Sequence, residues 1–568
     1  MNRITESYIN EFKKIFSFIN DDISEIFEAF SAYCVLCQES SDINNFDDIL
    51  TGGENDCAID SLAIIADGEY INSKEEAESR IEQKRDIEEL KFIFTQSKTS
   101  SSFDSGTILK LGAGVEDFFN ISSLSLKNEM IKEKNLISNV FLSNARKIKN
   151  IQCVLYYVTT GKWTEDRNLC SKINKVKRDL DELNLFSSVD FKTVDEKGLH
   201  KLYKLTKEPI KREIELSDRI TLPEMDKIEQ AFLCVINAKE FLKLITQDNF
   251  LVKKVFYDNV RDFQGDIPVN REIKNTLDSP QAGKFVLLNN GVTIICKKLR
   301  NIIRNDYEIS DYQIVNGCQT SHVLFYNRDL LNNSAVSISV KIIATQDDET
   351  VNKIIRSTNR QSVVSDSQFI TLTEFHKSLE EFYNSFEAEK RLYYERRSRQ
   401  YEHEQNIEKV RIVTFSQQLK AVASMFLDKP HISSQYYGKL INNVDGLFEL
   451  DHKLIVYYTS AYVLNRLEFM FRNKQLDYSY RKYRYHVLVV IKFIIMKSMN
   501  IKKIPEFNSA KIEKFCNKIL EIFYDNSKML QISEKAIKII EKVIIQNEDP
   551  ERMKKLTATV DLLKKEIF

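Results

Sequence analysis

Glycine is distributed unevenly along the chain, and this constrains the fold more than any other feature of the sequence. Twelve of the fourteen glycines lie at or before Gly317, and only Gly438 and Gly446 follow it. Glycine is needed where the backbone makes tight or left-handed turns, as it does between strands. We therefore expect strands and turns in the first three-fifths of the chain, and helices in the remainder.

Patterns along the sequence divide the chain into three predicted domains. The first proline is Pro209, near the point where the strand-like VDFKTV ends and the charged KLTKEPIKREIELSDR begins. We expect an α/β domain over 1–205, an α+β domain over 222–366 and an all-α domain over 367–568. At roughly 150 residues per domain, the chain is long enough for all three.

Composition is typical of a globular cytoplasmic protein. Hydrophobic residues make up 43% of the chain, and the net charge is only −1, so any surface that binds nucleic acid must be local. The nine cysteines, with Cys34 and Cys37 in a lone CxxC, are expected to be reduced and mostly buried. The most apolar run, Val487–Met496, contains Lys492 and is too short to cross a bilayer, so no membrane partner is expected.

An acid, an amide and a lysine occur at the ends of two predicted strands in the first hundred residues. Asp60 lies at the start of the predicted strand over 59–66, and Gln96 and Lys98 lie near the end of the one over 91–98. Residues two apart in a strand share a face, so Gln96 and Lys98 point to the same side. If the two strands are neighbours, the three side chains converge.

Two further acids flank this set. Glu28 lies on a predicted helix over 23–38 and is a candidate third acid, whereas Asp56 is expected to support Asp60 from a turn. Carboxylate and amide oxygens suit Mg²⁺ or Mn²⁺, which would polarise a phosphodiester and acidify water. Lys98 would orient that water or offset developing negative charge. The alternative is a solvated aspartate and an exposed strand lysine that share no function.

This arrangement resembles the PD-(D/E)xK nuclease superfamily, in its Mrr-like variant with a QxK motif. The resemblance implies a restriction-endonuclease-like fold for the N-terminal domain. It also implies that Asp60, Gln96 and Glu28 hold the metal ion and that Lys98 is the catalytic lysine. The sequence departs from the pattern at Ile59, where proline is common, and at Gln96, whose neutral amide weakens metal affinity.

Four polar motifs occur in order between predicted strands of the middle segment. They contain Asn259, Arg261, Asn289, Asn290, Gly291, Asn316, Gly317, Gln319, Thr320, Asn359, Arg360 and Gln361. Together they resemble the abortive-infection phage-resistance family, AIPR, over roughly 225–365. The resemblance implies a role in anti-phage defence, and many members carry a similar nuclease-like N-terminal segment.

The segment IVNGCQTSHVLF also resembles the strand–turn–helix element of ParB/sulfiredoxin-like nucleotide-binding domains. A glycine turn followed by a helix that begins near Thr320 would offer backbone N–H groups to a phosphate. Gln319 would add a hydrogen bond, and Arg261 or Arg360 would neutralise charge, so a nucleoside triphosphate is an expected ligand. The alternatives for single motifs are that NNG is only a hairpin turn, that Asn359 only caps a helix, and that His322 is packed.

Two stretches combine basic and aromatic residues. Residues 471–497 contain seven Lys or Arg and one acid, and tyrosines alternate with charge in DYSYRKYRY. The second stretch is RLYYERRSRQY. Phosphate pairing and base stacking would explain both, whereas the alternative is a solvated helix face with inward tyrosines. The candidate nucleic-acid-binding residues are Arg481, Lys482, Arg484, Arg396 and Arg397.

The leading hypothesis is a cytoplasmic anti-phage protein. A Mg²⁺- or Mn²⁺-dependent nuclease that cuts DNA or RNA would be regulated by an AIPR domain that binds a nucleotide or another ligand. A phage-derived trigger and a homodimer are the expected partners. The alternatives are an inactive ligand sensor or nucleic-acid-binding regulator, motivated by the neutral Gln96, and a scaffold of a larger defence complex, motivated by the helical C-terminus.

Overall fold

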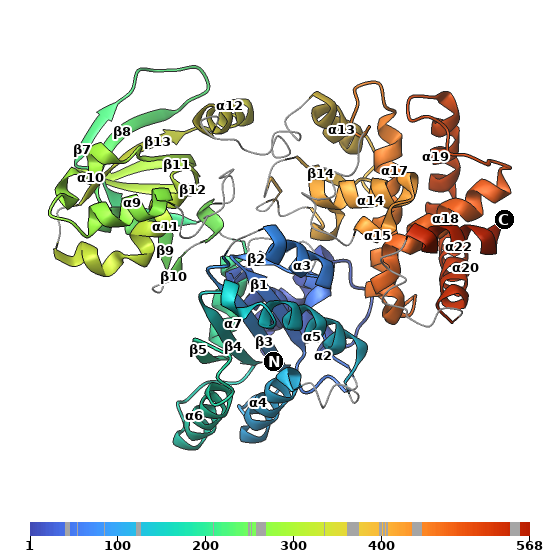
Figure 1. The fold of residues 1–568 in the computed structure, drawn as a ribbon, viewed down its shortest axis with the longest axis horizontal. Helices are drawn as coiled ribbons and strands as arrows, with labels where there is room; N and C mark the ends of the chain where they lie inside the picture. Colours follow the sequence, from blue (N-terminus) through green and yellow to red (C-terminus); the bar gives the residue numbers. More distant parts are fainter. Residues whose placement is uncertain are drawn as a thin grey trace.

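A computed structural model describes most of the chain as three successive regions (Figure 1). The described residues are those of 1–568 other than 40–45, 54, 84–85, 121–126, 208–209, 248–249, 252, 257–267, 334–335, 360–373, 397–399, 402–403, 405–406, 434–445 and 546–556. Separate hydrophobic cores form in the N-terminal, middle and C-terminal regions.

The N-terminal region is built on a mixed sheet. Within the described residues its strands are β1 (Ser61–Ala66), β2 (Glu69–Tyr70), β3 (Leu90–Lys98), β4 (Ile151–Thr159) and β5 (Ser188–Val194). The strand order is β2-β1-β3-β4-β5, with β2, β1 and β3 antiparallel and β3, β4 and β5 parallel. Sheets that contain parallel strands are usually covered on both faces, and here β1 is buried along its whole length.

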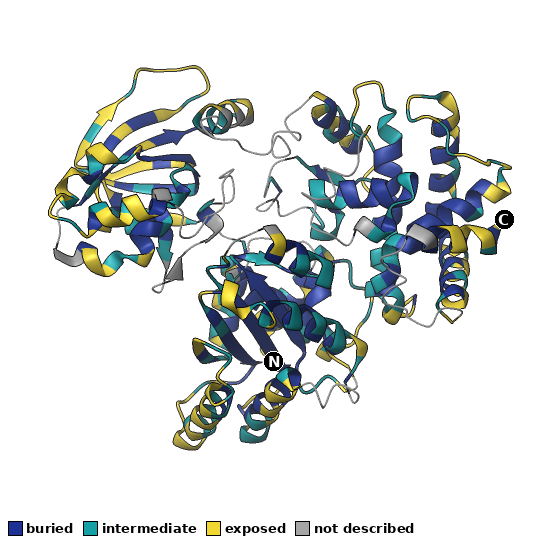
Figure 2. Cartoon of the chain, viewed as in Figure 1, coloured by how far each residue is buried: buried dark blue, intermediate teal, exposed yellow. Residues whose placement is uncertain are grey.

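Helices cover both faces of this sheet (Figures 1 and 2). One face packs against α1 (Arg3–Ile15), α2 (Ile23–Glu39), α7 (Glu196–Leu205) and the 3₁₀ helix η1 (Phe46–Ile49). The other packs against α3 (Lys74–Gln83), α4 (Ser105–Phe119), α5 (Glu129–Leu142) and α6 (Arg167–Asp181). Alternate residues of β1 divide between the two cores, with Ala63 and Ile65 on one side and Leu62 and Ile64 on the other.

The middle region contains a second, larger sheet. In the described part of this region its strands are β6 (Lys211–Glu215), β7 (Asp218–Thr221), β8 (Gln230–Asn237), β11 (Val292–Ile303), β12 (Asp306–Asn316) and β13 (Ser337–Ala344). The strand order is β6-β12-β11-β13-β8-β7, and only the β11–β13 pair is parallel among these described strands. A short hairpin of β9 (Thr246–Gln247) and β10 (Phe250–Leu251) lies beside it.

Helices pack on one face of the middle sheet and form its core. They are α8 (Ala238–Ile245), α9 (Pro268–Leu277), α10 (Phe285–Leu288) and α11 (Cys318–Tyr326). After β13, α12 (Asp348–Asn359) leads toward the C-terminal region. The alternate residues Leu233 and Val235 of β8 are exposed, because the helices leave the opposite face of this strand open.

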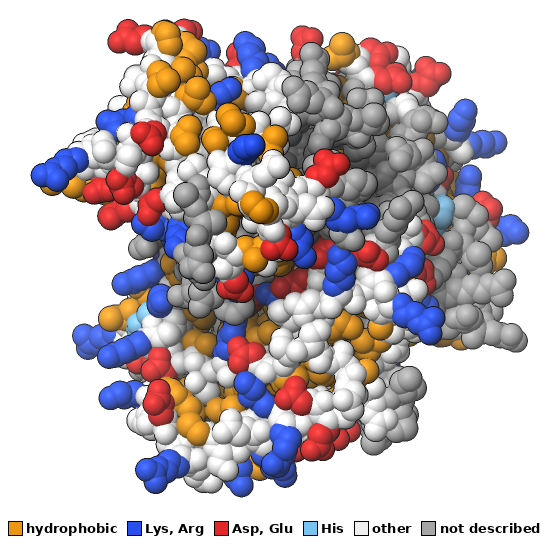
Figure 3. Space-filling view, turned by 60° about the vertical axis from the view of Figure 1, so that its left-hand side comes forward, with side chains coloured by type: hydrophobic (Ala, Val, Ile, Leu, Met, Phe, Trp, Pro, Cys, Tyr) orange, Lys and Arg blue, Asp and Glu red, His pale blue; other side chains and the backbone are white. Residues whose placement is uncertain are grey.

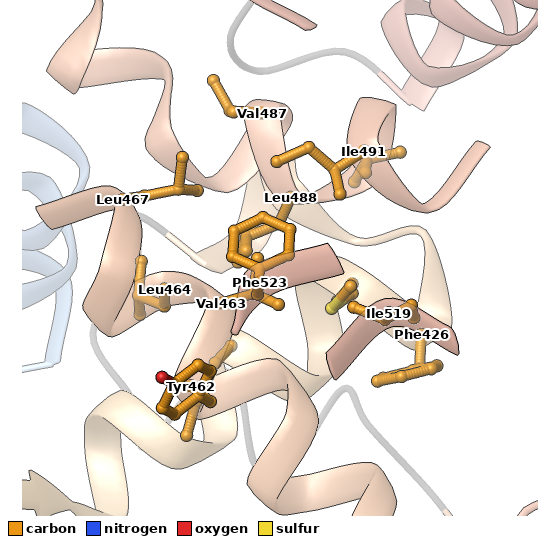
Figure 4. Close-up of a cluster of buried hydrophobic side chains, with 14 of the residues drawn as sticks. Phe426, Tyr462, Val463, Leu464, Leu467, Val487, Leu488, Ile491, Ile519 and Phe523 are labelled. Carbon is orange, nitrogen blue, oxygen red and sulfur yellow. The ribbon is translucent and has the colours of Figure 1, made fainter. Parts of the chain in front are cut away.

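The C-terminal region is a helical assembly around one apolar core. Its helices are α13 (Glu374–Asn384), α14 (Phe415–Leu427), α15 (Pro430–Ser433), α17 (Leu454–Arg472), α18 (Arg484–Ser498), α19 (Ala510–Phe523), α20 (Asn526–Ile545) and α22 (Thr557–Ile567), with the 3₁₀ helix η10 (Tyr478–Tyr483) before α18. Leu467, Leu488 and Phe523 bring α17, α18 and α19 together (Figure 4). No described helix combines the length and apolar composition needed to cross a membrane.

The coarse fold prediction is confirmed, and two local predictions are wrong. The chain is mixed α/β with a helical C-terminal region, and the nine cysteines are free, seven of them buried. A hairpin at NNG would need a strand before it, but residues 285–288 form the helical turn α10, which buries Phe285 and exposes Leu287 and Leu288. The C-terminal region is not all-α as predicted, because β14 (Tyr393–Glu395) pairs with β15 (Ile412–Thr414).

Candidate functional site

The predicted convergence of Asp60 and Gln96 is present in the structure. β1 and β3 are antiparallel neighbours, and Ser61 pairs with Thr95. The backbone N–H of Asp60 donates to the carbonyl of Thr95 at 2.9 Å, which extends the ladder by one residue. Nε2 of Gln96 then lies 2.8 Å from both carboxylate oxygens of Asp60. The strand pairing therefore brings the acid and the amide into direct contact.

Ser97 is a further member of the site that the sequence analysis missed. Its backbone N–H and its hydroxyl donate to Oδ2 of Asp60 at 2.6 and 2.8 Å. Strand alternation assigns Ser97 to the face opposite Gln96, so the residue pattern gave no reason to include it. Its backbone donor could have been expected, because the residue after Gln96 lies diagonally across the ladder from Asp60.

Hydrogen bonds to backbone carbonyls hold together the two ends of the loop over residues 51–60, which carries Asp60. The N–H groups of Thr51 and Gly52 donate to the carbonyl of Asp60 at 2.9 and 3.2 Å, and Oγ1 of Thr51 donates to Ile59 at 2.6 Å. Asp56 acts as the predicted turn residue, since its Oδ1 accepts from the N–H of Ala58 at 2.8 Å. The position of Asp60 thus depends on the segment that precedes it.

This loop also contains backbone strain. Asn55, Cys57 and Ala58 have φ values of +60°, +58° and +57°, a region where each L-residue costs about 1–2 kcal/mol. Helix α4 packs tightly against the strained turn. A Cβ on Gly114 would lie 1.7 Å from the carbonyl oxygen of Cys57, so no larger residue fits there.

Glu28 reaches the site from α2. A Cβ on Gly52 would lie 3.0 Å from Oε2 of Glu28, which places this carboxylate against the same loop. Burial, followed by repulsion from Asp60, raises the pKa of Glu28 to about 7. Burial likewise raises the pKa of Asp60 to about 6, although the hydrogen bonds from Ser97 and the charge of Lys98 oppose it. Lys98 is exposed and makes no ion pair within the described residues.

The donor chemistry of this cluster suits a hard divalent cation. Asp60 is only 4% exposed, yet no described cation forms an ion pair with it, so its charge is left without a counter-ion. Carboxylates of Asp60 and Glu28 and the amide oxygen of Gln96 are the oxygen ligands that Mg²⁺ and Mn²⁺ prefer. The amide nitrogen of Gln96 faces Asp60 in the structure, so the amide would have to turn over to offer its oxygen.

A tighter group of possible metal ligands lies in the C-terminal region. Among the described residues, the only three acidic, histidine or cysteine side chains whose ligand atoms all lie within 4.8 Å of one another are Glu449, Asp451 and His452. Both acids are exposed, and Nδ1 of His452 lies 2.9 Å from the hydroxyl of Tyr457. This is the arrangement of a surface loop. The buried carboxylates, Asp60 above all, remain the better candidates.

In the middle region, two of the predicted polar motifs meet. Nδ2 of Asn289 donates to Oγ1 of Thr320 at 3.0 Å, and Oδ1 of Asn289 accepts from the N–H of Gly291 at 2.9 Å. Gly317 has a φ of +100°, and a Cβ there would lie 2.6 Å from Val292 Cγ2. The NNG motif therefore connects a helix to a strand, and the predicted hairpin is absent.

Other polar groups of these motifs also contact the protein itself. Nδ2 of Asn316 donates to the carbonyl of Thr358 at 2.6 Å, and Oε1 of Gln319 accepts from Asn270 at 2.8 Å. His322 is packed, with its ring 4.8 Å from that of Phe256. Asn290 is exposed. The predictions for Asn259, Arg261, Arg360, Gln361 and the side chain of Asn359 lie outside the described residues.

Arg481 and Arg484, which were predicted to bind nucleic acid, instead pair with acids of the protein itself. Arg481 is buried and the Arg484 side chain is 15% exposed, and both pair with Asp48 and Glu468, so neither is a free cation for phosphate. Lys482 lies near Glu129 and Glu133 at 3.5 and 3.8 Å.

In the second stretch, Nε of Arg396 pairs with Glu380 at 2.9 Å, and both side chains are mostly buried. Arg396 is therefore a structural residue as well, rather than a free cation for phosphate. Arg397 lies outside the described residues. The described arginines Arg396, Arg481 and Arg484 therefore serve ion pairs within the protein.

Comparison with known proteins gives one match. A family model described as AIPR protein matches residues 256–543, which is about half of the chain. The match includes the Asn289 and Thr320 motifs and extends through α17, η10 and α18. The N-terminal sheet lies outside it. Neither a curated protein nor a solved structure matches the chain.

Proposed function

The chain belongs to the AIPR family, and on that premise we propose that it is a divalent-metal-dependent nuclease of abortive-infection anti-phage defence. Family membership points to the defence role. One observation is the main support for the nuclease activity. Asp60 contacts Gln96 and Ser97 at the ends of two adjacent strands, beside Lys98 and Glu28. The substrate would be the phosphodiester backbone of DNA or RNA.

Each residue of the site has a separate role in this proposal. Gln96 and Ser97 fix the orientation of the Asp60 carboxylate through their hydrogen bonds. A cation bound by Asp60, Gln96 and Glu28 would polarise the phosphodiester and acidify water. The exposed ammonium of Lys98 would pair with the phosphate or orient the water. Without a cation the pKa of Glu28 is about 7, so binding of the cation near neutral pH would release a proton from this carboxylate.

The topology of the N-terminal region supports the nuclease proposal. Three antiparallel strands are followed by helices and by a parallel strand, β4, beside β3. This arrangement resembles the core of restriction-endonuclease-like domains. The acid and the lysine also lie at the same edge of the sheet, as that resemblance implies.

Cations that form no ion pair within the described residues lie on and beside the helices that follow β3 and β4, and they support a polyanionic substrate. The loop after Lys98 contacts the end of β4, since Oγ1 of Thr159 donates to the carbonyl of Ser100 at 2.8 Å. Helices α4 and α6, which follow β3 and β4, project together at the bottom of Figure 1, and Lys and Arg side chains lie among acidic and hydrophobic ones in the lower part of Figure 3. The cations there that form no ion pair within the described residues are Lys98, Lys110, Lys162, Arg167, Lys172 and Lys175.

Regulation by a nucleotide or another ligand is the second part of the proposal. Helix α11 begins after Gly317, and no side chain caps its first turn. Thr320 and Asn289, which hydrogen-bond to each other there, could both turn toward a bound phosphate. Calorimetric titration with ATP and GTP tests this, with Thr320→Ala as the variant. Heat that is equal in both proteins, or absent from the wild type, would contradict a nucleotide site at α11.

Substitutions at the site test the nuclease proposal. We expect Asp60→Asn and Lys98→Gln each to lower cleavage of DNA and RNA in the presence of Mg²⁺ or Mn²⁺ by about a thousandfold. The exposed Lys201 on α7 offers a matched control, and Lys201→Gln should retain the wild-type rate. Equal cleavage by all four proteins would show that the activity arises elsewhere, such as from a contaminating nuclease.

A second candidate function is an inactive sensor with a nuclease-like domain. The observation that favours it is that Gln96 is neutral and presents its amide nitrogen to Asp60, so the carboxylate is already satisfied by protein donors. A wild-type protein that binds nucleic acid but neither cleaves it nor binds Mn²⁺ would favour this candidate.

A further inference from the structure

A buried cluster of ion pairs joins the N-terminal region to the C-terminal helices. We call it the arginine clamp, and its members are Asp47, Asp48, Glu468, Arg472, Arg481 and Arg484. The two aspartates belong to η1, whereas the other four lie on α17, η10 and α18. The clamp therefore links the family-matched part of the chain to a part that lies outside the match.

The first half of the clamp is a forked pair between Asp47 and Arg472. Nε of Arg472 donates to Oδ1 of Asp47 at 2.9 Å, and Nη2 donates to Oδ2 at 2.5 Å. Two parallel bonds fix the relative orientation of the two groups as well as their distance. The hydroxyl of Tyr478 also donates to the backbone carbonyl of Asp47 at 2.9 Å.

The second half is a chain of charges around Asp48. Nη1 of Arg481 donates to Oδ1 of Asp48, and its Nε donates to Glu468 at 2.7 Å. Arg484 bridges the same two acids, at 3.7 Å from Asp48 and 3.2 Å from Glu468. The Asp48 and Arg481 side chains are only 8% and 5% exposed, so water screens this pair weakly.

The clamp continues directly into the loop that holds Asp60. Leu50, one residue after η1, forms a bridge with Ser61, and the next two N–H groups bond to the carbonyl of Asp60. The same short segment touches the Glu28 carboxylate through Gly52. Residues 46–52 thus have one end fixed by arginines of the C-terminal helices and the other end fixed to the candidate site.

We propose that the clamp makes the C-terminal helices a positioning element for the Asp60 site. While α17 and η10 are docked, segment 46–52 is held and the Asp60 loop stays closed. A ligand or partner that moves these helices would release the segment and open the loop. The functional role of the clamp rests on the proposed nuclease. The coupling between the clamp and the Asp60 loop can be tested without measuring nuclease activity.

Hydrogen–deuterium exchange of the full chain measures that coupling. The variants are Arg472→Gln and Asp47→Asn, the second of which keeps the shape of the side chain in case the first does not fold. We expect each to speed exchange in peptides that cover 46–62 and 94–98 by about tenfold or more, because the N–H groups of Thr51, Gly52 and Ser97 lose their protection. Peptides that cover β11 serve as an internal reference.

A control separates the clamp from the interface in general. Lys474 pairs with Glu25 across the same pair of regions, but their side chains are 64% and 42% exposed and neither touches segment 46–52. Lys474→Gln should leave the exchange of both peptides within twofold of the wild type. The proposal would be overturned if Arg472→Gln and Asp47→Asn exchanged like the wild type at 46–62. It would also be overturned if they sped exchange in the β11 peptides equally.

Mn²⁺ affinity supplies a second readout that a purely structural role would not change. We expect at least tenfold weaker binding by calorimetry in Asp47→Asn, well below its unfolding temperature. Unchanged affinity would overturn the claim that the clamp positions the site. If the wild type binds no Mn²⁺ while the exchange result holds, the proposed nuclease fails and the coupling stands.

Discussion

Two buried aspartates lie twelve positions apart in the N-terminal region, and their surroundings differ in one respect. Burial favours the neutral form of Asp48, but the charges of Arg481 and Arg484 outweigh it and hold its pKa at about 2. Asp60 is as deeply buried but has no arginine partner among the described residues, and burial raises its pKa to about 6. Nearby Glu28 has its pKa raised to about 7.

The difference separates a structural role from a binding role. Burying a charged carboxylate lowers the stability of the fold unless a cation lies beside it. At Asp47 and Asp48, whose role is to join two regions, the chain supplies three arginines. At Asp60 it supplies hydrogen bonds from Gln96 and Ser97, and the cation that acts on both Asp60 and Glu28 is the exposed Lys98. We therefore interpret these carboxylates as a candidate site where a bound cation would supply the compensating charge.

Breaking the clamp should give the largest effect. Arg481→Ala leaves two buried carboxylates with less compensation, and we expect it to lower the free energy of unfolding by about 3–5 kcal/mol. Urea unfolding measures this loss. The exposed pair at the same interface provides the control, since Lys474→Ala should change stability by less than about 0.5 kcal/mol. Similar losses in the two variants would contradict the special role of the clamp.

The same substitution at the two aspartates should have opposite effects. Because the pKa of Asp60 is raised in the folded state, its ionisation costs stability as pH rises from about 4 through 6. In EDTA, Asp60→Asn should therefore stabilise the protein at pH 8 by on the order of 2 kcal/mol, and the gain should vanish at pH 4.

Because the pKa of Asp48 is lowered, the Asp→Asn substitution should have the opposite effect on stability at this position. Its ionised form contributes stability above about pH 4, and this contribution is lost only as pH falls toward 2. Asp48→Asn should therefore destabilise the protein at pH 8 by roughly 2 kcal/mol or more. Unfolding curves at both pH values check the pair. Changes of the same sign at pH 8 would remove the distinction between the two carboxylates.

Backbone strain offers a smaller test of the site loop. Ala58 has a φ of +57°, so Ala58→Gly should relieve strain that exceeds the added entropy of the unfolded chain. We expect a net gain of roughly 0.5 kcal/mol in thermal unfolding. Ala113→Gly, at an exposed position on α4, makes the same change in a helix and should instead lose about 0.5–1 kcal/mol. Losses of equal size at both positions would show that the loop holds no strain.

The parts of the site that could be predicted from sequence are those set by local patterns. Two apolar runs with polar residues near their ends predicted two strands, and Asp60 and Gln96 were expected to meet if these strands were neighbours, as the structure shows they are. The helical C-terminal region followed from the scarcity of glycine after Gly317. Ser97 was missed because strand alternation assigns its side chain to the face opposite Gln96, and its backbone N–H could be expected to reach Asp60 only once the strand pairing was known.

The clamp could not be predicted in the same way. Asp47 and Arg472 are 425 positions apart, and no local pattern indicates that η1 docks on the end of α17. The charge of Arg481 and Arg484 is visible in the sequence, but a basic stretch looks the same whether it faces solvent or buried acids. Only the packing of the two regions distinguishes nucleic-acid binding from an internal ion-pair network.

Calorimetric titration with Mn²⁺ tests most directly whether the carboxylates of Asp60 and Glu28 bind a cation. We expect the wild type to bind Mn²⁺ at pH 8, to lose most of that affinity at pH 5, where Asp60 and Glu28 are protonated, and to lose it at both pH values in Asp60→Asn. Equal binding by the wild type and Asp60→Asn, or none by either at pH 8, would contradict the account.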